Sequence, residues 1–174
     1  MKKGKKKNLK TLNWDLIQTK MRVFVEVLLQ KKWKIPITLD VYEFSKELPI
    51  KNERGYDGFV SFFALDNEMY IDYIAVRKRR NKEYKTFVIA HELGHILDFI
   101  EKGYDKGYLN NSISKRIIWE CEKRAFAKGY DLLKIVGMPV HYLEKYISEF
   151  RSKSLGFLIC QLGEKKNIGV YKHF

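Results

Sequence analysis

The chain has 174 residues, of which 45% are hydrophobic and 14% aromatic, and a formal charge of +13. This composition excludes an intrinsically disordered chain and favours one domain with a hydrophobic core. No apolar run reaches the ~20 residues that span a bilayer, and no signal-peptide core follows the first lysines. Two cysteines, Cys121 and Cys160, are too few for a disulfide framework, so we expect a cytoplasmic protein.

Basic residues are concentrated in two segments. Residues 1–12 are lysine-rich and are predicted to form a basic disordered tail, and residues 13–174 a single domain. A second basic run covers residues 77–82. Both segments could contact nucleic acid or simply be solvated, and no helix-turn-helix or aromatic RNA-binding pattern accompanies them.

The first half of the domain shows a change of hydrophobic period. Apolar residues at helical spacing predict a helix from its cap Asn13 to about Lys32. Asp40, followed by Glu43, resembles a capping box and predicts a short helix to about Glu47. Aromatic and β-branched residues over 59–65 and 69–76 then predict an antiparallel hairpin.

Helices dominate the second half. We predict them over residues 83–101, ended by Gly103, and over about 112–133 and 140–151. Residues 157–162 and 168–174 are compatible with short strands or with a packed tail. Helices around a small antiparallel sheet make the expected fold class α+β.

The sequence His91-Glu-Leu-Gly-His95 is the motif that indicates a metal site. On a helix His91 and His95 share one face and can bind one metal ion, which imidazole ligands suggest is zinc. Glu92, rotated by ~100°, is placed to take a proton from metal-bound water rather than to bind the metal. Because the surrounding residues are apolar, two buried histidines would be costly without such a partner.

The third protein ligand must come from another segment. Glu120 and Glu122 lie in the next predicted helix, which can run antiparallel to the histidine helix. The two glutamates differ by ~200° of helix rotation, so only one of them can face the metal. Helical periodicity alone does not choose between them.

Residues 87–95, together with the downstream pattern Glu120-x-Glu122-x-x-x-Phe126-Ala127, resemble the ImmA/IrrE zinc metallopeptidases. The resemblance covers about residues 38–140. It implies a helical zincin-like domain, of the gluzincin type, with a small antiparallel sheet beside the active-site helix. It also implies Glu120 as the third zinc ligand, with Glu122 as the alternative.

The same resemblance implies an activity and a substrate. The expected activity is peptide-bond hydrolysis through zinc-bound water, with Glu92 as the general base. The expected substrate is a specific regulatory protein, such as a helix-turn-helix repressor encoded in a mobile element or phage. In related enzymes an extended peptide pairs with a sheet edge beside the metal helix, which suggests residues 69–76 for this role.

One residue departs from the family pattern. Arg124 stands four residues after Glu120, where related peptidases often carry an Asp or Asn that orients the first histidine. An Arg cannot accept the imidazole proton, so Asp98 is a candidate replacement. The alternative function is a catalytically weakened zinc-binding regulatory interaction protein, which could associate with nucleic acid.

An enzyme of this kind needs a donor for the oxyanion that forms during hydrolysis. The candidates are Tyr108, Tyr130, His141 and Tyr142, and the sequence does not rank them.

Overall fold

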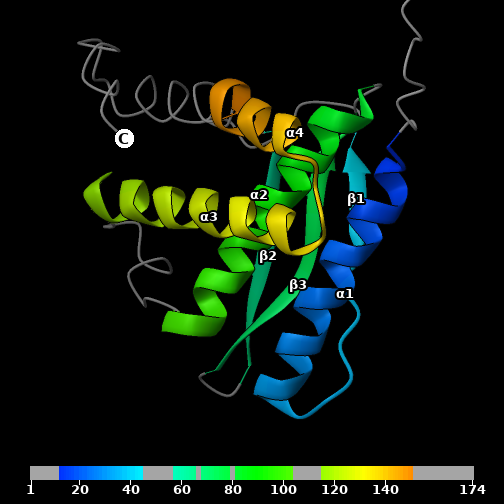
Figure 1. Cartoon of the computed structure of the whole chain (residues 1–174). Helices are drawn as coiled ribbons and strands as arrows, with labels where there is room; N and C mark the ends of the chain where they lie inside the picture. Colours follow the sequence, from blue (N-terminus) through cyan, green and yellow to red (C-terminus); the bar gives the residue numbers. More distant parts are fainter. Residues whose placement is uncertain (1–11, 45–56, 66–67, 79–80, 104–114, 151–174) are drawn as a thin grey trace, which may run out of the picture.

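The computed structural model describes residues 12–44, 57–65, 68–78, 81–103 and 115–150 (Figure 1). These residues combine helices with a small three-stranded sheet, as expected for an α+β protein. In chain order the elements are α1 (Trp14–Trp33), β1 (Val41–Phe44), β2 (Gly58–Leu65), β3 (Glu68–Arg77), α2 (Lys82–Lys102), α3 (Lys115–Ile135), α4 (Val140–Lys145) and the π-helical turn η2 (Tyr146–Phe150). Most of the basic tail, and the segments 157–162 and 168–174, lie outside the described residues.

The four longer predicted helices are present, and the ends of α1 and α2 have clear chemical causes. The Asn13 side chain accepts a hydrogen bond from the Leu16 amide at 3.1 Å, which caps α1 as predicted. Asn81 caps α2 in the same way, and Gly103 ends it with a φ of +75°. The helix predicted over 140–151 is α-helical only to Lys145 and continues as the π-helical turn η2.

The sheet has the strand order β1-β3-β2. The predicted hairpin is confirmed, because β2 and β3 pair antiparallel. The sheet as a whole is mixed rather than antiparallel, because β1 pairs parallel with β3. Since β3 is the central strand, it is not the sheet edge that we expected to receive a peptide; β1 and β2 are the outer strands.

The short helix predicted from Asp40 to Glu47 is wrong over the residues that the structure describes. Residues 41–44 form β1, and the Ile74 amide of β3 donates to the Asp40 carbonyl at 2.9 Å. Valine and aromatic residues favour this extended conformation. Pairing with the neighbouring strand therefore outweighs the local capping pattern of Asp40 and Glu43.

Helix α2 is the centre of the molecule. It contacts the sheet and α1, and α3 crosses it on the side away from the sheet (Figure 1). All residues from Thr86 to Gly94 are consequently buried, the polar His91 and Glu92 among them. A single hydrophobic core joins α1, β3, α2, α3 and α4. The site residues of α2 are thus held by packing on several sides.

Helices α2 and α3 approach unusually closely where they cross. A Cβ atom on Gly94 would lie 2.0 Å from the Ala125 carbonyl oxygen of α3. A Cβ atom on Gly129 would lie 2.6 Å from the Ala90 carbonyl oxygen of α2. Since backbone atoms cannot move aside easily, only glycine fits at these two positions. The close approach lets a side chain of α3 reach the face of α2 that carries His91 and His95.

Replacing Gly94 by Ala should lower the free energy of unfolding by ~2 kcal/mol or more, because the added methyl group overlaps a backbone carbonyl. Urea unfolding followed by circular dichroism measures this effect. The matched control is Ala127→Ser on the exposed side of α3, which should cost only ~0.5 kcal/mol. Equal losses for the two variants would contradict the close helix crossing.

Within the described ranges, no helix combines the length and apolar character needed to cross a membrane.

Candidate metal centre

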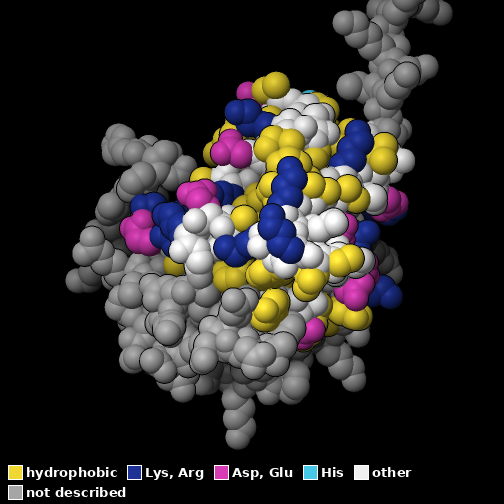
Figure 2. All heavy atoms as spheres, turned by 90° about the horizontal axis from the view of Figure 1, so that it is seen from below, with side chains coloured by type: hydrophobic (Ala, Val, Ile, Leu, Met, Phe, Trp, Pro, Cys, Tyr) yellow, Lys and Arg dark blue, Asp and Glu magenta, His cyan; other side chains and the backbone are white. Residues whose placement is uncertain are grey.

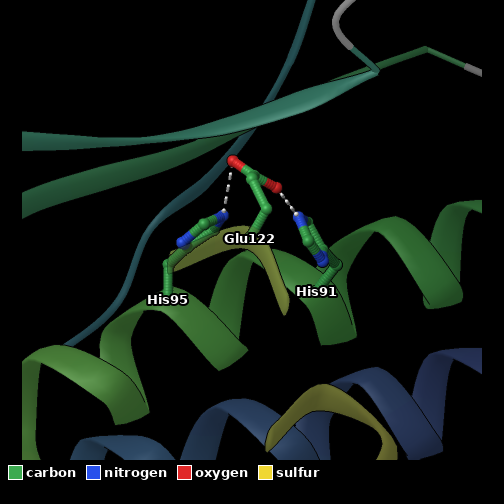
Figure 3. Close-up of side chains that lie close together, drawn as sticks. All are labelled: His91, His95 and Glu122. Atoms are coloured by element: carbon green, nitrogen blue, oxygen red, sulfur yellow. Dashed lines mark hydrogen bonds and ion pairs between the residues drawn. The ribbon is translucent and has the colours of Figure 1, made fainter. Parts of the chain in front are cut away.

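Two histidines of α2 and one glutamate of α3 converge on a single point (Figure 3). The Glu122 carboxylate lies between the rings, with Oε2 2.9 Å from His91 Nε2 and Oε1 3.4 Å from His95 Nε2. The histidines share one face of α2, as their spacing predicts, and Glu122 approaches them from the crossing helix. The sequence-predicted pair is therefore completed by a carboxylate from α3.

This group could hold a metal ion. It offers two imidazole nitrogens and one carboxylate oxygen, all within 4.8 Å of one another. For comparison, an ion with tetrahedral bonds of ~2.1 Å keeps its ligand atoms about 3.4 Å apart. In the structure Glu122 uses two different oxygens, Oε2 at 2.9 Å from His91 Nε2 and Oε1 at 3.4 Å from His95 Nε2. The three side chains are thus close enough together to hold a metal ion.

The structure places Glu120, the third ligand that the resemblance implies, away from the histidines. The Glu120 side chain is 47% exposed and lies 3.6 Å from Lys123 Nζ on its own helix. Glu122, the alternative, occupies the place beside the histidines instead. The cause is the rotation of α3: Ala125 and Gly129 face α2, and Glu122 shares their side of the helix, whereas Glu120 is rotated away.

The group is electrostatically coupled. Burial opposes a charge on His95, but the nearby Glu122 carboxylate outweighs burial and raises the pKa of His95 to about 9. Burial would likewise raise the pKa of Glu122, yet the two histidines hold it well below its usual range. Glu122 is therefore ionised and His95 protonated at neutral pH. A metal ion bound here would have to displace that proton.

Glu92 lies beside the group and is not a member of it. It is 5% exposed, and burial raises the pKa of its carboxyl group despite the charges of His91 and His95. A Cβ atom on Gly58, the first residue of β2, would lie 2.9 Å from Glu92 Oε1. Gly58 thus leaves the space that the Glu92 carboxylate occupies. No sequence pattern marks Gly58 as part of a site, because a glycine at the start of a strand has many structural uses.

Arg124 and Asp98 form a second link between α2 and α3. Asp98 is buried and accepts hydrogen bonds from Arg124 Nε at 2.9 and 2.8 Å. Arg124 also donates from Nη2 to Cys121 Sγ at 3.1 Å. The described hydrogen bonds of Asp98 thus go to Arg124, and its negative charge contributes to the raised pKa of His95. Arg124 therefore forms an ion pair that joins α3 to α2. It does not replace the Asp or Asn that accepts a hydrogen bond from a histidine in related peptidases.

Replacing Arg124 by Met should destabilise the fold by ~1–2 kcal/mol, because the Asp98 carboxylate is left buried without its cation. This value allows for the partial exposure of Arg124, whose side chain is 32% accessible. Urea unfolding of Arg124→Met, Asp98→Asn and the double variant gives the coupling energy. A double variant no more stable than the sum of the single changes would argue against the pair.

Three of the four candidate oxyanion donors are among the described residues, and the contacts described for them are with other side chains than the three of this group. Tyr108 lies outside the described residues. Tyr130 lies beneath Lys134, whose Nζ is 5.6 Å from the ring centroid. His141 packs on Tyr142, with 4.0 Å between the ring centroids.

A different tyrosine lies near the acidic residues of the site. Tyr146 is fully buried, and burial, together with the charges of Glu92 and Glu122, raises its pKa well above the ordinary value. It follows α4 at the start of η2. No motif in the sequence marks it, because its position depends on how α4 packs across α2 and α3.

Comparison of the chain with models of protein families, with curated proteins and with solved structures finds no match.

Proposed function

We propose that this protein is a zinc-dependent metallopeptidase with His91, His95 and Glu122 as ligands and Glu92 as the general base. The observation that carries the proposal is the convergence of two imidazoles and one carboxylate beside a second, buried carboxylate. Two nitrogens and one oxygen suit Zn²⁺ and leave a coordination position for a water molecule or a substrate. When bound, zinc would supply Lewis-acid chemistry toward water and toward the scissile carbonyl.

The role of Glu92 follows from its place on α2. One position beyond His91, its side chain is rotated away from the ligand set and lies against Gly58. Burial raises the pKa of Glu92, which makes the carboxylate a stronger base than an exposed one. It can accept a proton from the attacking water and then deliver that proton to the leaving amine.

The proposed family is ImmA/IrrE, and the proposed substrate is a specific regulatory protein such as a helix-turn-helix repressor in the cytoplasm. Support comes from the sequence pattern over residues 87–95 and from Glu122 and Phe126 downstream. The α+β arrangement, with a sheet beside the histidine helix, is compatible with a zincin-like domain.

A catalytically weakened zinc-binding regulatory protein is the second candidate. With Glu122 as the ligand, the position four residues later is Phe126, and a phenylalanine, like Arg124 after Glu120, cannot accept a proton from a histidine ring. The presence of Glu92 beside the ligands favours the enzyme. Association with nucleic acid has less support. The face seen in Figure 2 carries Lys and Arg side chains interspersed with hydrophobic ones rather than gathered in one continuous patch.

The proposal is tested by measuring metal content and hydrolysis on the same purified protein. After removal of metal with a chelator and reloading, we expect about one zinc ion per chain by mass spectrometry. Incubation with a peptide library should create new amino termini only in the zinc-loaded sample. Failure to retain stoichiometric zinc would overturn the proposal. Zinc retention without cleavage of peptides or of candidate repressors would favour the regulatory protein.

A further inference from the structure

Tyr146 occupies the space between α2 and α3. Its ring stacks on Phe126 of α3, with 4.8 Å between the centroids and an interplanar angle of 11°. It also meets Phe87 of α2 edge-on, with a centroid separation of 5.4 Å and an angle of 77°. The side chain has no exposed surface. One ring therefore contacts both helices that carry the candidate ligands.

The two phenylalanines stand at equivalent places relative to those ligands. Phe87 lies one helical turn before His91, and Phe126 lies one turn after Glu122. Aromatic pairs in these geometries contribute ~0.5–1.5 kcal/mol each beyond the area that they bury. Tyr146 thus couples the turn adjoining one ligand to the turn adjoining another.

The Tyr146 hydroxyl adds a polar contact to the α3 backbone. It donates to the Phe126 carbonyl at 3.3 Å, and a Cβ atom on Gly129 would lie 2.8 Å from its oxygen. The hydroxyl is thus accommodated where Gly129 leaves room on α3. Glycine at position 129 therefore serves two purposes: it lets α2 and α3 cross closely, and it leaves space for the Tyr146 hydroxyl.

We infer that Tyr146 is a positioning residue for the metal centre: by filling the space between Phe87 and Phe126 it holds α3 where Glu122 meets both histidines. The inference rests on the proposed metal function. It assigns α4 and η2 a role in metal affinity, although neither contributes a ligand. Replacing a residue that orients metal ligands from outside the coordination shell typically lowers metal affinity by ~10–100-fold.

The test is titration of the metal-free protein with Co²⁺, whose visible absorption reports both affinity and coordination geometry. We expect Tyr146→Leu to raise the Kd for Co²⁺ by roughly tenfold or more and to alter the spectrum. Tyr146→Phe keeps the ring and should stay within ~3-fold of wild type. Tyr142→Leu is the matched control, because Tyr142 belongs to α4 but meets Trp14 of α1 at 4.8 Å. It should leave the Kd and the spectrum unchanged.

Phe126→Leu removes the ring on which Tyr146 stacks, and it should weaken Co²⁺ binding in the same direction. It serves as the test if Tyr146→Leu does not fold. Wild-type affinity and spectrum in whichever of these two variants folds would overturn the inference while leaving the proposed function intact. Failure of the wild-type protein to bind Co²⁺ or Zn²⁺ would overturn both.

Discussion

Replacing Glu122 by Gln should abolish stoichiometric zinc binding, whereas replacing Glu120 by Gln should leave it intact. Glu122 is the carboxylate that lies 2.9 and 3.4 Å from the two histidine nitrogens, and an amide there is a much poorer zinc ligand. We expect the Kd for zinc to rise by at least ~100-fold. Competition with a chromophoric chelator measures the Kd in each variant.

Glu120→Gln is a close control, because it makes the same chemical change two residues away on the same helix. Glu120 is 47% exposed, so the substitution should leave the fold and the zinc affinity unchanged. Circular dichroism would establish that both variants are folded. The opposite result, with zinc lost in Glu120→Gln and kept in Glu122→Gln, would restore the assignment that the family resemblance implied.

Replacing Glu92 by Gln should retain zinc and remove hydrolysis. Gln has nearly the same shape, so it can lie against Gly58 as Glu92 does, but its amide cannot accept the proton from water. General-base catalysis contributes ~10²–10⁴-fold, and the rate of peptide cleavage should fall by at least that factor. Mass spectrometric counting of new amino termini in a peptide library provides the measurement.

Glu101→Gln is the control for this experiment. Glu101 lies near the end of α2, where its described partner is Lys128 of α3, and its loss should change neither zinc content nor cleavage. Undiminished cleavage by Glu92→Gln would exclude Glu92 as the general base. Loss of zinc from that variant would instead give Glu92 a place among the ligands.

Sequence patterns predicted the spacing of the histidine pair and the four longer helices well, because these features depend on local chemistry. The cap residue Asn13, the terminal Gly103 and the spacing of His91 and His95 all act within a turn or two of helix. The strand at residues 41–44 was missed because its hydrogen bonds go to β3, some thirty residues further along the chain. A local capping pattern carries no information about that partner.

The choice between Glu120 and Glu122 as the candidate third ligand needed information about which face of α3 meets α2. That information was present in the sequence. Ala125 and Gly129 lie within ~60° of Glu122 around the helix, while Glu120 is ~140° or more from either of them. Small residues mark the side on which another backbone approaches. Gly58 and Tyr146 had no comparable marker, because their positions depend on the packing of β2 and of α4 and η2.

The close crossing of α2 and α3 has a consequence for finding relatives of this protein. Ala90 and Gly94 on one helix, and Ala125 and Gly129 on the other, form a reciprocal pair of small-xxx-small motifs. Each motif begins at a fixed offset from a candidate ligand, one position before His91 and three positions after Glu122. Together they define a pattern that distant homologues should preserve even where overall identity has been lost. A chain that combines both motifs with the histidine pair should place its glutamate as this one does.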